Sequence, residues 1–177
     1  MHLMLKRILL LSISMLSLVS VSSKAVDSID DIVWTTENLP PDNYLNEKNE
    51  LVGDSVDIVG SILKVTGSTK TIKDIKVLPW ATAYENALNN KNYALFSTGR
   101  TEKREKLFKW AGPLHEIKIV ILTKKNNNIR IRSLDEVKQY RIAAVKDDIS
   151  QQVMNSAVKG LSLSLAANTN DNLLRLN

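Results

Sequence analysis

The feature that most constrains the fold is the alternation of strand-like and helix-like segments along residues 31–177. Apolar and β-branched runs predict strands, at residues 31–36, 71–78, 93–97, 116–123, 141–145 and 161–166. Apolar residues at helical spacing, or a capping pattern, predict helices between them, at residues 54–66, 81–89, 101–108, 133–136 onward, 149–159 and 171 onward. Strands separated by helices form a mostly parallel sheet, so an α/β protein is expected, with ligand sites at the carboxyl ends of its strands.

Residues 1–25 have the composition of a secretory signal peptide. Lys6 and Arg7 precede an apolar, serine-rich run at residues 8–21, and small residues at Ser23 and Ala25 fit cleavage after Ala25. The run is shorter than the roughly 20 apolar residues of a spanning helix, which favours a cleaved signal over a membrane anchor. The sequence therefore predicts export to a periplasm.

Export changes what the charge implies. Of the 24 Lys and Arg residues, three lie in the signal, which leaves 21 against 19 acidic residues and a net charge of +2. Without a basic block, no nucleic-acid partner is expected. The chain has no cysteine, so its stability must come from a packed core, and its two histidines offer no metal-binding cluster. No cofactor or metal is predicted, and a monomer is expected.

One stretch raises a specific question. Residues 94–114, ALFSTGRTEKREKLFKWAGPL, pass from an apolar strand into hydroxyl residues, a glycine and two arginines. Such a stretch is either a solvated turn or a place that holds an anion. By pattern alone, the arginines would pair with the neighbouring glutamates on a solvated surface.

The order of the blocks resembles a known family. The stretches WTTENLPPDNYLNEKNELVGDSVDIVGSIL, VLPWATAYENALNNKNYALFSTGRTEKREKLFKWAGPL and IRSLDEVKQYRIAAVKDD are similar to those of bacterial extracellular solute-binding proteins of family 3, the periplasmic receptors of polar amino-acid-type ABC importers. The resemblance implies a periplasmic-binding-protein-like (type II) α/β fold, with lobe 1 at residues 26–118, and a hinge strand and partial lobe 2 at residues 119–177. Residues 116–124 would form the first crossing strand, between two lobes that close on a solute.

The resemblance also implies a binding site. In the family, the arginine of a T-x-x-R segment binds a ligand carboxylate, which on this sequence is Arg104. A guanidinium grips a carboxylate through two parallel hydrogen bonds, and a helix capped by Thr101 would add a favourable dipole. Ser97, Thr98 and Gly99 would face the cleft at the end of the preceding strand.

Two aromatic residues complete the predicted site. Tyr44 matches the family's aromatic platform for the solute, with an exposed loop tyrosine as the alternative. Trp80 could line the cleft, although packing within lobe 1 is the simpler interpretation. Asp147 and Asp148 stand where the family often binds an anion, and two acids there would repel one.

Several departures leave the function open. Asp54 replaces a usually apolar residue, and would either cap a helix or weaken the core. Family members are longer, which indicates a truncated member whose second lobe is incomplete. The leading hypothesis is a receptor that passes a small, carboxylate-bearing solute to a membrane ABC permease. The alternatives are a non-functional remnant, or less plausibly an enzyme on the same fold, for which no nucleophile–base pair is discernible.

Overall fold

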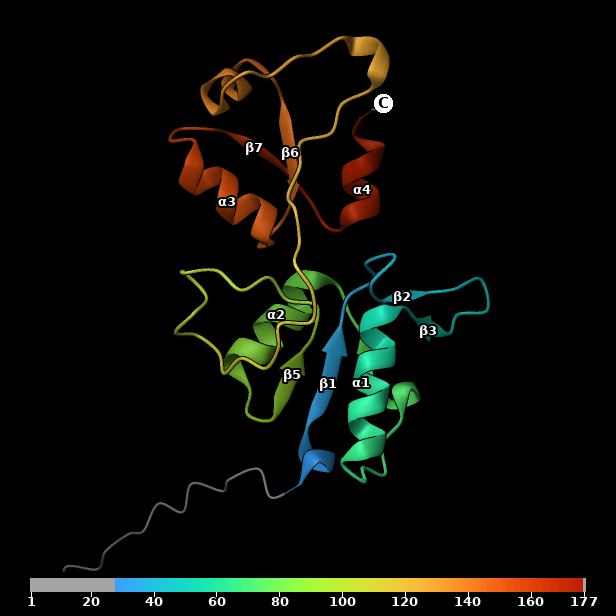
Figure 1. The fold of residues 1–177 in the computed structure, drawn as a ribbon. Helices are drawn as coiled ribbons and strands as arrows, with labels where there is room; N and C mark the ends of the chain where they lie inside the picture. The colour runs from blue at the N-terminus through green and yellow to red at the C-terminus, as the bar shows by residue number, and fades with distance from the viewer. Residues whose placement is uncertain (1–27, 177) are drawn as a thin grey trace, which may run out of the picture.

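The computed structural model describes residues 28–176, which form two α/β lobes joined by one extended segment (Figure 1). The predicted signal peptide lies outside the described residues. Three parallel strands form the N-terminal lobe's main sheet: β1 (Val33–Thr36), β4 (Lys76–Val77) and β5 (Tyr93–Leu95), in the order β4-β1-β5. Their carboxyl ends point toward the C-terminal lobe, as the arrow of β1 shows in Figure 1.

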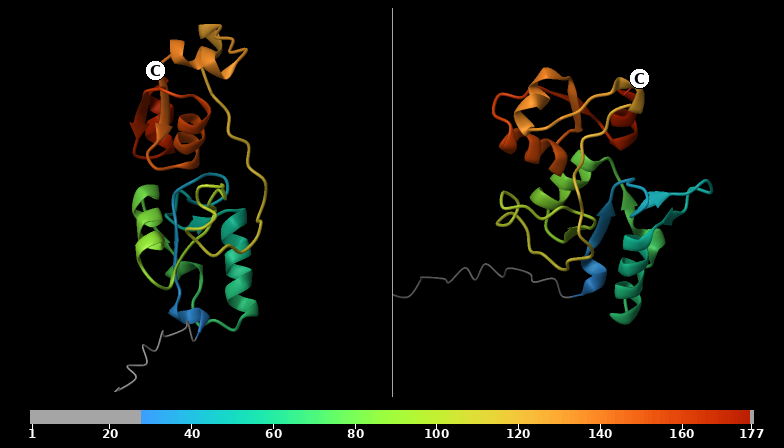
Figure 2. Two further views of the ribbon diagram at one scale, coloured as in Figure 1. Left: turned by 90° about the vertical axis from the view of Figure 1, so that its left-hand side faces the viewer. Right: turned by 45° about the horizontal axis from the view of Figure 1, so that its top comes forward.

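Two helices cover this sheet. Helices α1 (Asp54–Val65) and α2 (Trp80–Asn89) lie on opposite sides of β1 in Figures 1 and 2. The apolar stripe of α1 packs into a core with strand and loop residues, whose buried members are Leu51, Val56, Val59, Leu63, Ile75 and Phe96. The helical spacing predicted for residues 54–66 and 81–89 is therefore confirmed, and Val56, Val59 and Leu63 face inward as that spacing requires.

Short elements connect these parts. The 3-10 turns η1 (Ile29–Asp31) and η2 (Ile72–Asp74) precede β1 and β4, and strands β2 (Tyr44–Leu45) and β3 (Leu51–Val52) form an antiparallel hairpin. By sequence alone, residues 37–50 read as a loop, because they contain two prolines and four asparagines. The strand predicted at residues 71–78 is in fact η2 followed by the two-residue β4.

Gly53 is required by the backbone at the start of α1. It has φ of 125°, a conformation that side-chain-bearing residues rarely adopt, and a Cβ there would collide with the carbonyl of Asp42. Gly53 occupies the N-cap position without a side-chain hydrogen bond. The expectation that Asp54 caps this helix is thus wrong, and Asp54 is exposed at its first position, outside the core.

The C-terminal lobe is smaller. Strands β6 (Ile142–Val145) and β7 (Leu163–Ala166) pair in parallel, and helices α3 (Ile149–Ala157) and α4 (Thr169–Leu174) lie on opposite sides of β6 in Figure 1. The core consists of Val137, Met154 and Val158 with partly buried neighbours. Two 3-10 helices precede β6 in the chain: η3 (Lys125–Asn127) and then η4 (Leu134–Gln139). The predicted capping box at Ser133 does not form, because Glu136 accepts a hydrogen bond from the Arg132 backbone instead.

Two predicted elements are absent from the described residues. Residues 101–108 form successive turns, with backbone bonds from Arg104 to Thr101 and from Leu107 to Arg104, rather than a helix. Helix nucleation is unfavourable, and so short a stretch adds too few further hydrogen bonds to offset it. Residues 116–123 are not a strand either, because none of the strands within residues 28–176 pairs with them.

Among residues 28–176, no helix combines the length and the apolar character needed to cross a membrane. The same residues contain no group of three or more His, Cys, Asp or Glu side chains arranged to hold a metal ion.

Candidate functional site

The guanidinium of Arg104 lies buried where the two lobes meet. Arg104 is only 1% exposed. Its Nη1 donates to the carbonyl of Gly99 at 3.2 Å in the N-terminal lobe, and its Nη2 donates to the carbonyl of Asp147 at 3.0 Å in the C-terminal lobe. One side chain therefore connects the two lobes directly, although it lies in a turn and gains no helix dipole.

Two aromatic rings of α2 surround the same guanidinium. Its central carbon lies 5.2 Å from the ring centre of Trp80 and 4.9 Å from that of Tyr84. A cation held against ring faces in a desolvated place is stabilised by the ring quadrupoles. Burial lowers the pKa of Arg104, and the nearby Tyr84 and Asp148 counteract part of this decrease. Because an arginine starts from so high a pKa, the side chain keeps its charge.

The loop from Ser97 to Gly99 lies beside this cluster. Ser97 adopts the left-handed conformation with φ of 57°, and Thr98 donates its hydroxyl hydrogen bond to the carbonyl of Leu95 at 3.2 Å. A Cβ on Gly99 would collide with Cδ1 of Ile149 at the start of α3. The absence of a side chain at Gly99 therefore lets the C-terminal lobe approach the loop that holds Arg104.

The structure brings some predicted site residues together and not others. Trp80 is buried and belongs to the Arg104 cluster through its ring, so it both packs the lobe and borders the site. Tyr44 lies half-buried in β2, opposite Val52. Within residues 28–176, no hydrogen bond or ring contact joins the Tyr44 side chain to Arg104.

Sequence analysis did not predict a role for Glu37, which follows β1 directly. Asn43 donates to the backbone carbonyl of Glu37 at 2.7 Å and so fixes the turn that carries it. Asp148, whose carboxylate caps α3 by accepting from the backbone N–H of Ser150, belongs to the other lobe and acts on Glu37 through its charge. Burial, with the negative charge of Asp148, raises the pKa of Glu37 to about 7. The sequence feature that could have indicated a site role for Glu37 is its position at the carboxyl end of a strand.

Several buried polar atoms in this region have no hydrogen-bond partner. They include Nε of Arg104, Oγ of Ser97, Nε1 of Trp80 and Oγ1 of Thr36. A buried donor or acceptor without a partner costs free energy, so such atoms are uncommon and mark places where a polar group can be received. The interface between the lobes thus offers unfilled donors beside one cation and two carboxylates.

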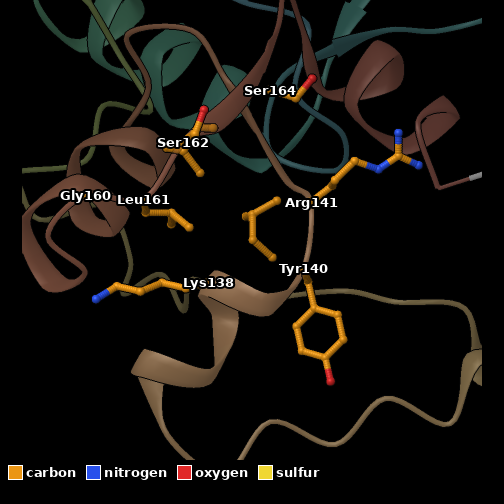
Figure 3. A pocket seen from close by; sticks show the side chains of 9 residues that line it. Lys138, Tyr140, Arg141, Gly160, Leu161, Ser162 and Ser164 are labelled. Carbon is orange, nitrogen blue, oxygen red and sulfur yellow. The ribbon is translucent and has the colours of Figure 1, made fainter.

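Two surface hollows lie elsewhere. One of about 470 Å³ borders β6 and β7, and Figure 3 shows the charged ends of its Lys138 and Arg141 pointing in opposite directions. The other, of about 480 Å³, follows the exposed side of α1 along Ile58, Ile62 and Val65. Neither gathers polar groups on one point, so neither matches the site at Arg104.

The two α/β lobes with parallel sheets define a periplasmic-binding-protein-like fold, as predicted. A sequence model of the bacterial extracellular solute-binding proteins, family 3, matches residues 32–176. The chain belongs to this family, which confirms the resemblance found in its sequence motifs. Among proteins of curated function, none matches the chain.

Solved structures of amino-acid-binding proteins share the fold. An ancestral arginine-binding protein bound to glutamine matches with a TM-score of 0.69 at 21% identity, over 82% of this chain and 64% of that one. An amino acid ABC transporter substrate-binding protein from Streptococcus pneumoniae bound to L-arginine matches with a TM-score of 0.68 at 18% identity, over 82% and 62%.

A third structure is the ancestral amino acid-binding protein AncCDT-1, a precursor of cyclohexadienyl dehydratase, with a TM-score of 0.69 at 15% identity, over 82% of this chain and 65% of that one. This chain therefore spans slightly less than two thirds of the length of these three proteins. At such identities the likeness establishes the fold.

Proposed function

We propose that this chain is a periplasmic receptor, exported through a cleaved signal at residues 1–25, which delivers a small amino-acid-like solute to a membrane ABC permease. Residues 26–118 would be its first lobe, and residues 119–177 would supply a hinge strand and a partial second lobe, with the hinge strand bending during closure. The observation that carries the proposal is the buried guanidinium of Arg104, which reaches across from one lobe to the other.

The solute carboxylate would bind Arg104. The two hydrogen bonds of this guanidinium now go to neutral carbonyls, those of Gly99 and Asp147. A carboxylate is the stronger acceptor because it is charged and can take two parallel N–H bonds. It would replace these carbonyls once the lobes separate, with the hydroxyls of Ser97 and Thr98 beside it. Tyr44 and Trp80 would contribute aromatic surface around the solute.

A positively charged group on the solute would lie between Glu37 and Asp148. These carboxylates come from different lobes, and repulsion from Asp148 adds to burial in raising the pKa of Glu37. A solute ammonium between them would relieve that repulsion and favour closure. An amino-acid-like zwitterion fits this arrangement better than a simple carboxylate does.

A second candidate is acid–base catalysis by Glu37. A carboxyl with a pKa of about 7 is suited to general acid chemistry near neutral pH. Incubation with hydroxy-carboxylates and amino acids, followed by product analysis, tests this candidate. The receptor proposal expects every compound to be recovered unchanged.

A thermal-shift screen against amino acids, small carboxylates and polyamines tests the receptor proposal. A solute at about 100 times its dissociation constant stabilises a protein by about 2.7 kcal/mol, or about 5–10 °C for a chain of this size. Arg104→Ala should abolish this shift. Arg104→Lys, which keeps the charge but loses the paired donors, should weaken binding at least about tenfold.

Arg100→Ala is the matched control in the same loop, because Arg100 is exposed and pairs with Glu105 at 2.6 Å. This variant should bind as the wild type does. The proposal fails if no amino acid or carboxylate shifts the melting temperature. It also fails if Arg100→Ala and Arg104→Lys affect binding equally, because the effect would then not come from the buried guanidinium.

A further inference from the structure

The Arg104 side chain has little support from its own loop. It extends from the turns of residues 101–108, and an arginine confined to one rotamer loses conformational entropy. Across residues 28–176 its guanidinium forms no salt bridge. Within the N-terminal lobe it donates to the carbonyl of Gly99 at 3.2 Å, the long end of the usual range. Its bond to the carbonyl of Asp147 comes from the other lobe and is lost whenever the lobes separate.

Helix α2 supplies aromatic support for the same guanidinium. Trp80 and Tyr84 are four residues apart, so they lie on one side of the helix, and their ring centres are 5.5 Å apart. The central carbon of the guanidinium lies 4.9 Å from the ring centre of Tyr84 and 5.2 Å from that of Trp80. Both distances are within the range of about 6 Å for a cation–π interaction. A helix also holds such rings more precisely than a loop does.

Tyr84 is the ring on which these contacts converge. Phe108 meets it edge to face, with ring centres 5.4 Å apart and 66° between the ring planes, an arrangement that aromatic pairs favour. Phe108 and Arg104 belong to the same run of turns, so Tyr84 contacts this run at two points. Trp80 is 2% exposed and packs the lobe as well, whereas Tyr84 is half-buried. Tyr84 is therefore the better residue for separating support of Arg104 from support of the fold.

We propose that Tyr84 is a positioning residue of the carboxylate site, whose ring keeps the Arg104 guanidinium in its binding orientation. This inference rests on the proposed function, because it concerns the arginine that would bind the solute. With the lobes apart, the hydrogen bond to Asp147 is gone, and the rings of α2 hold the side chain together with Gly99. A guanidinium that is already ordered loses less conformational freedom when a carboxylate binds, so binding is tighter.

The ring can do this without competing with a solute. All N–H groups of a guanidinium lie in its plane, whereas a cation–π contact places the ring over a face of the cation. Tyr84 therefore leaves the in-plane donors of Arg104 available to a carboxylate. It follows that Tyr84→Phe, which keeps the ring, should preserve the support, and that Tyr84→Leu, which is apolar but has no ring, should remove it.

NMR relaxation of the arginine Nε–H groups tests the support without any solute. Nε of Arg104 is buried, so its hydrogen is protected from exchange, and Arg104→Lys identifies its signal by removing it. In the wild type and in Tyr84→Phe this group should be as rigid as the backbone, and in Tyr84→Leu it should become mobile. Trp110→Leu is the matched control, because Trp110 contacts Phe108 at 5.8 Å and its ring lies against Arg100 instead of Arg104.

Titration with acetate, followed by the amide signals of residues 97–99, tests the effect on carboxylate binding. Tyr84→Leu should raise the dissociation constant for acetate about tenfold, whereas Tyr84→Phe and Trp110→Leu should change it less than about twofold. In an Arg104→Lys background, Tyr84→Leu should have no further effect, because a positioning residue acts only through the group that it positions. A merely structural role would weaken binding in both backgrounds.

The outcomes separate this inference from the proposed function. If acetate does not bind the wild type, the carboxylate role of Arg104 fails, and the relaxation measurement still decides the role of Tyr84. The inference is overturned if the Arg104 Nε–H is mobile in the wild type or stays rigid in Tyr84→Leu. It is also overturned if Tyr84→Leu and Trp110→Leu weaken acetate binding equally. Should Tyr84→Leu fail to fold, Tyr84→Met, whose flexible side chain fills irregular space, replaces it with the same expected results.

Discussion

The carboxyl group of Glu37 gives the sharpest test of how the two lobes meet. Burial and the nearby Asp148 raise its pKa from an ordinary 4.5 to about 7. In the unfolded chain this carboxyl loses its proton near pH 4.5, whereas in the folded chain it keeps the proton to near pH 7. Between these values the folded state binds more protons, so its stability falls as the pH rises. We expect Glu37→Gln, which is always neutral, to remove this loss.

The magnitude follows from the two pKa values. Each pKa unit corresponds to about 1.4 kcal/mol, so a rise from 4.5 to about 7 sets an upper limit of about 3 kcal/mol above pH 7. Glu37 is half-buried rather than fully enclosed, and solvent screening reduces the figure to about 1–2 kcal/mol. For a chain of this length, that corresponds to about 3–6 °C in melting temperature.

Thermal unfolding of Glu37→Gln and the wild type at pH 5 and pH 8 measures the effect. The variant should gain stability over the wild type at pH 8 and little at pH 5. Glu85→Gln, on the exposed side of α2, removes a carboxylate without burial and should show no such difference. An equal effect of Glu37→Gln at both pH values would refute the reasoning, because the carboxyl would then not be desolvated beside Asp148.

Two further predictions concern the N-terminal lobe, and urea unfolding measures both. Leu63→Ala, at a site only 1% exposed in the α1 core, should cost about 2–5 kcal/mol, and a loss no greater than that of exposed Leu88→Ala would contradict this core. Gly53→Ala should cost about 3 kcal/mol or more, because φ of 125° is combined with a collision against Asp42. Gly67→Ala, with φ of 71° and open space around it, should cost only about 1 kcal/mol.

Sequence patterns predicted those helices and strands that are stabilised by their own residues. The apolar spacing of α1 and α2 and the short runs with apolar residues that form β1, β6 and β7 depend on local propensity and on one buried face. The hairpin β2–β3 escaped notice because its two-residue strands pair with each other through backbone bonds, not through an apolar pattern. Residues 116–123 show the opposite error, because the strand predicted there does not form. Ile117 to Leu122 have strong strand propensity, yet propensity cannot supply a neighbouring strand.

The same limit applies to the site. Arg104 could be proposed from a motif, because the residue and its neighbours lie within one stretch of sequence. Its partner in the C-terminal lobe is the backbone carbonyl of Asp147, and a carbonyl is present at every position, so no residue type marks it. The raised pKa of Glu37 likewise depends on burial and on the charge of Asp148, which is more than a hundred residues away in the sequence. Residue types therefore indicated that Arg104 could bind a carboxylate, whereas the approach of the two lobes decides which other groups share one desolvated space with it.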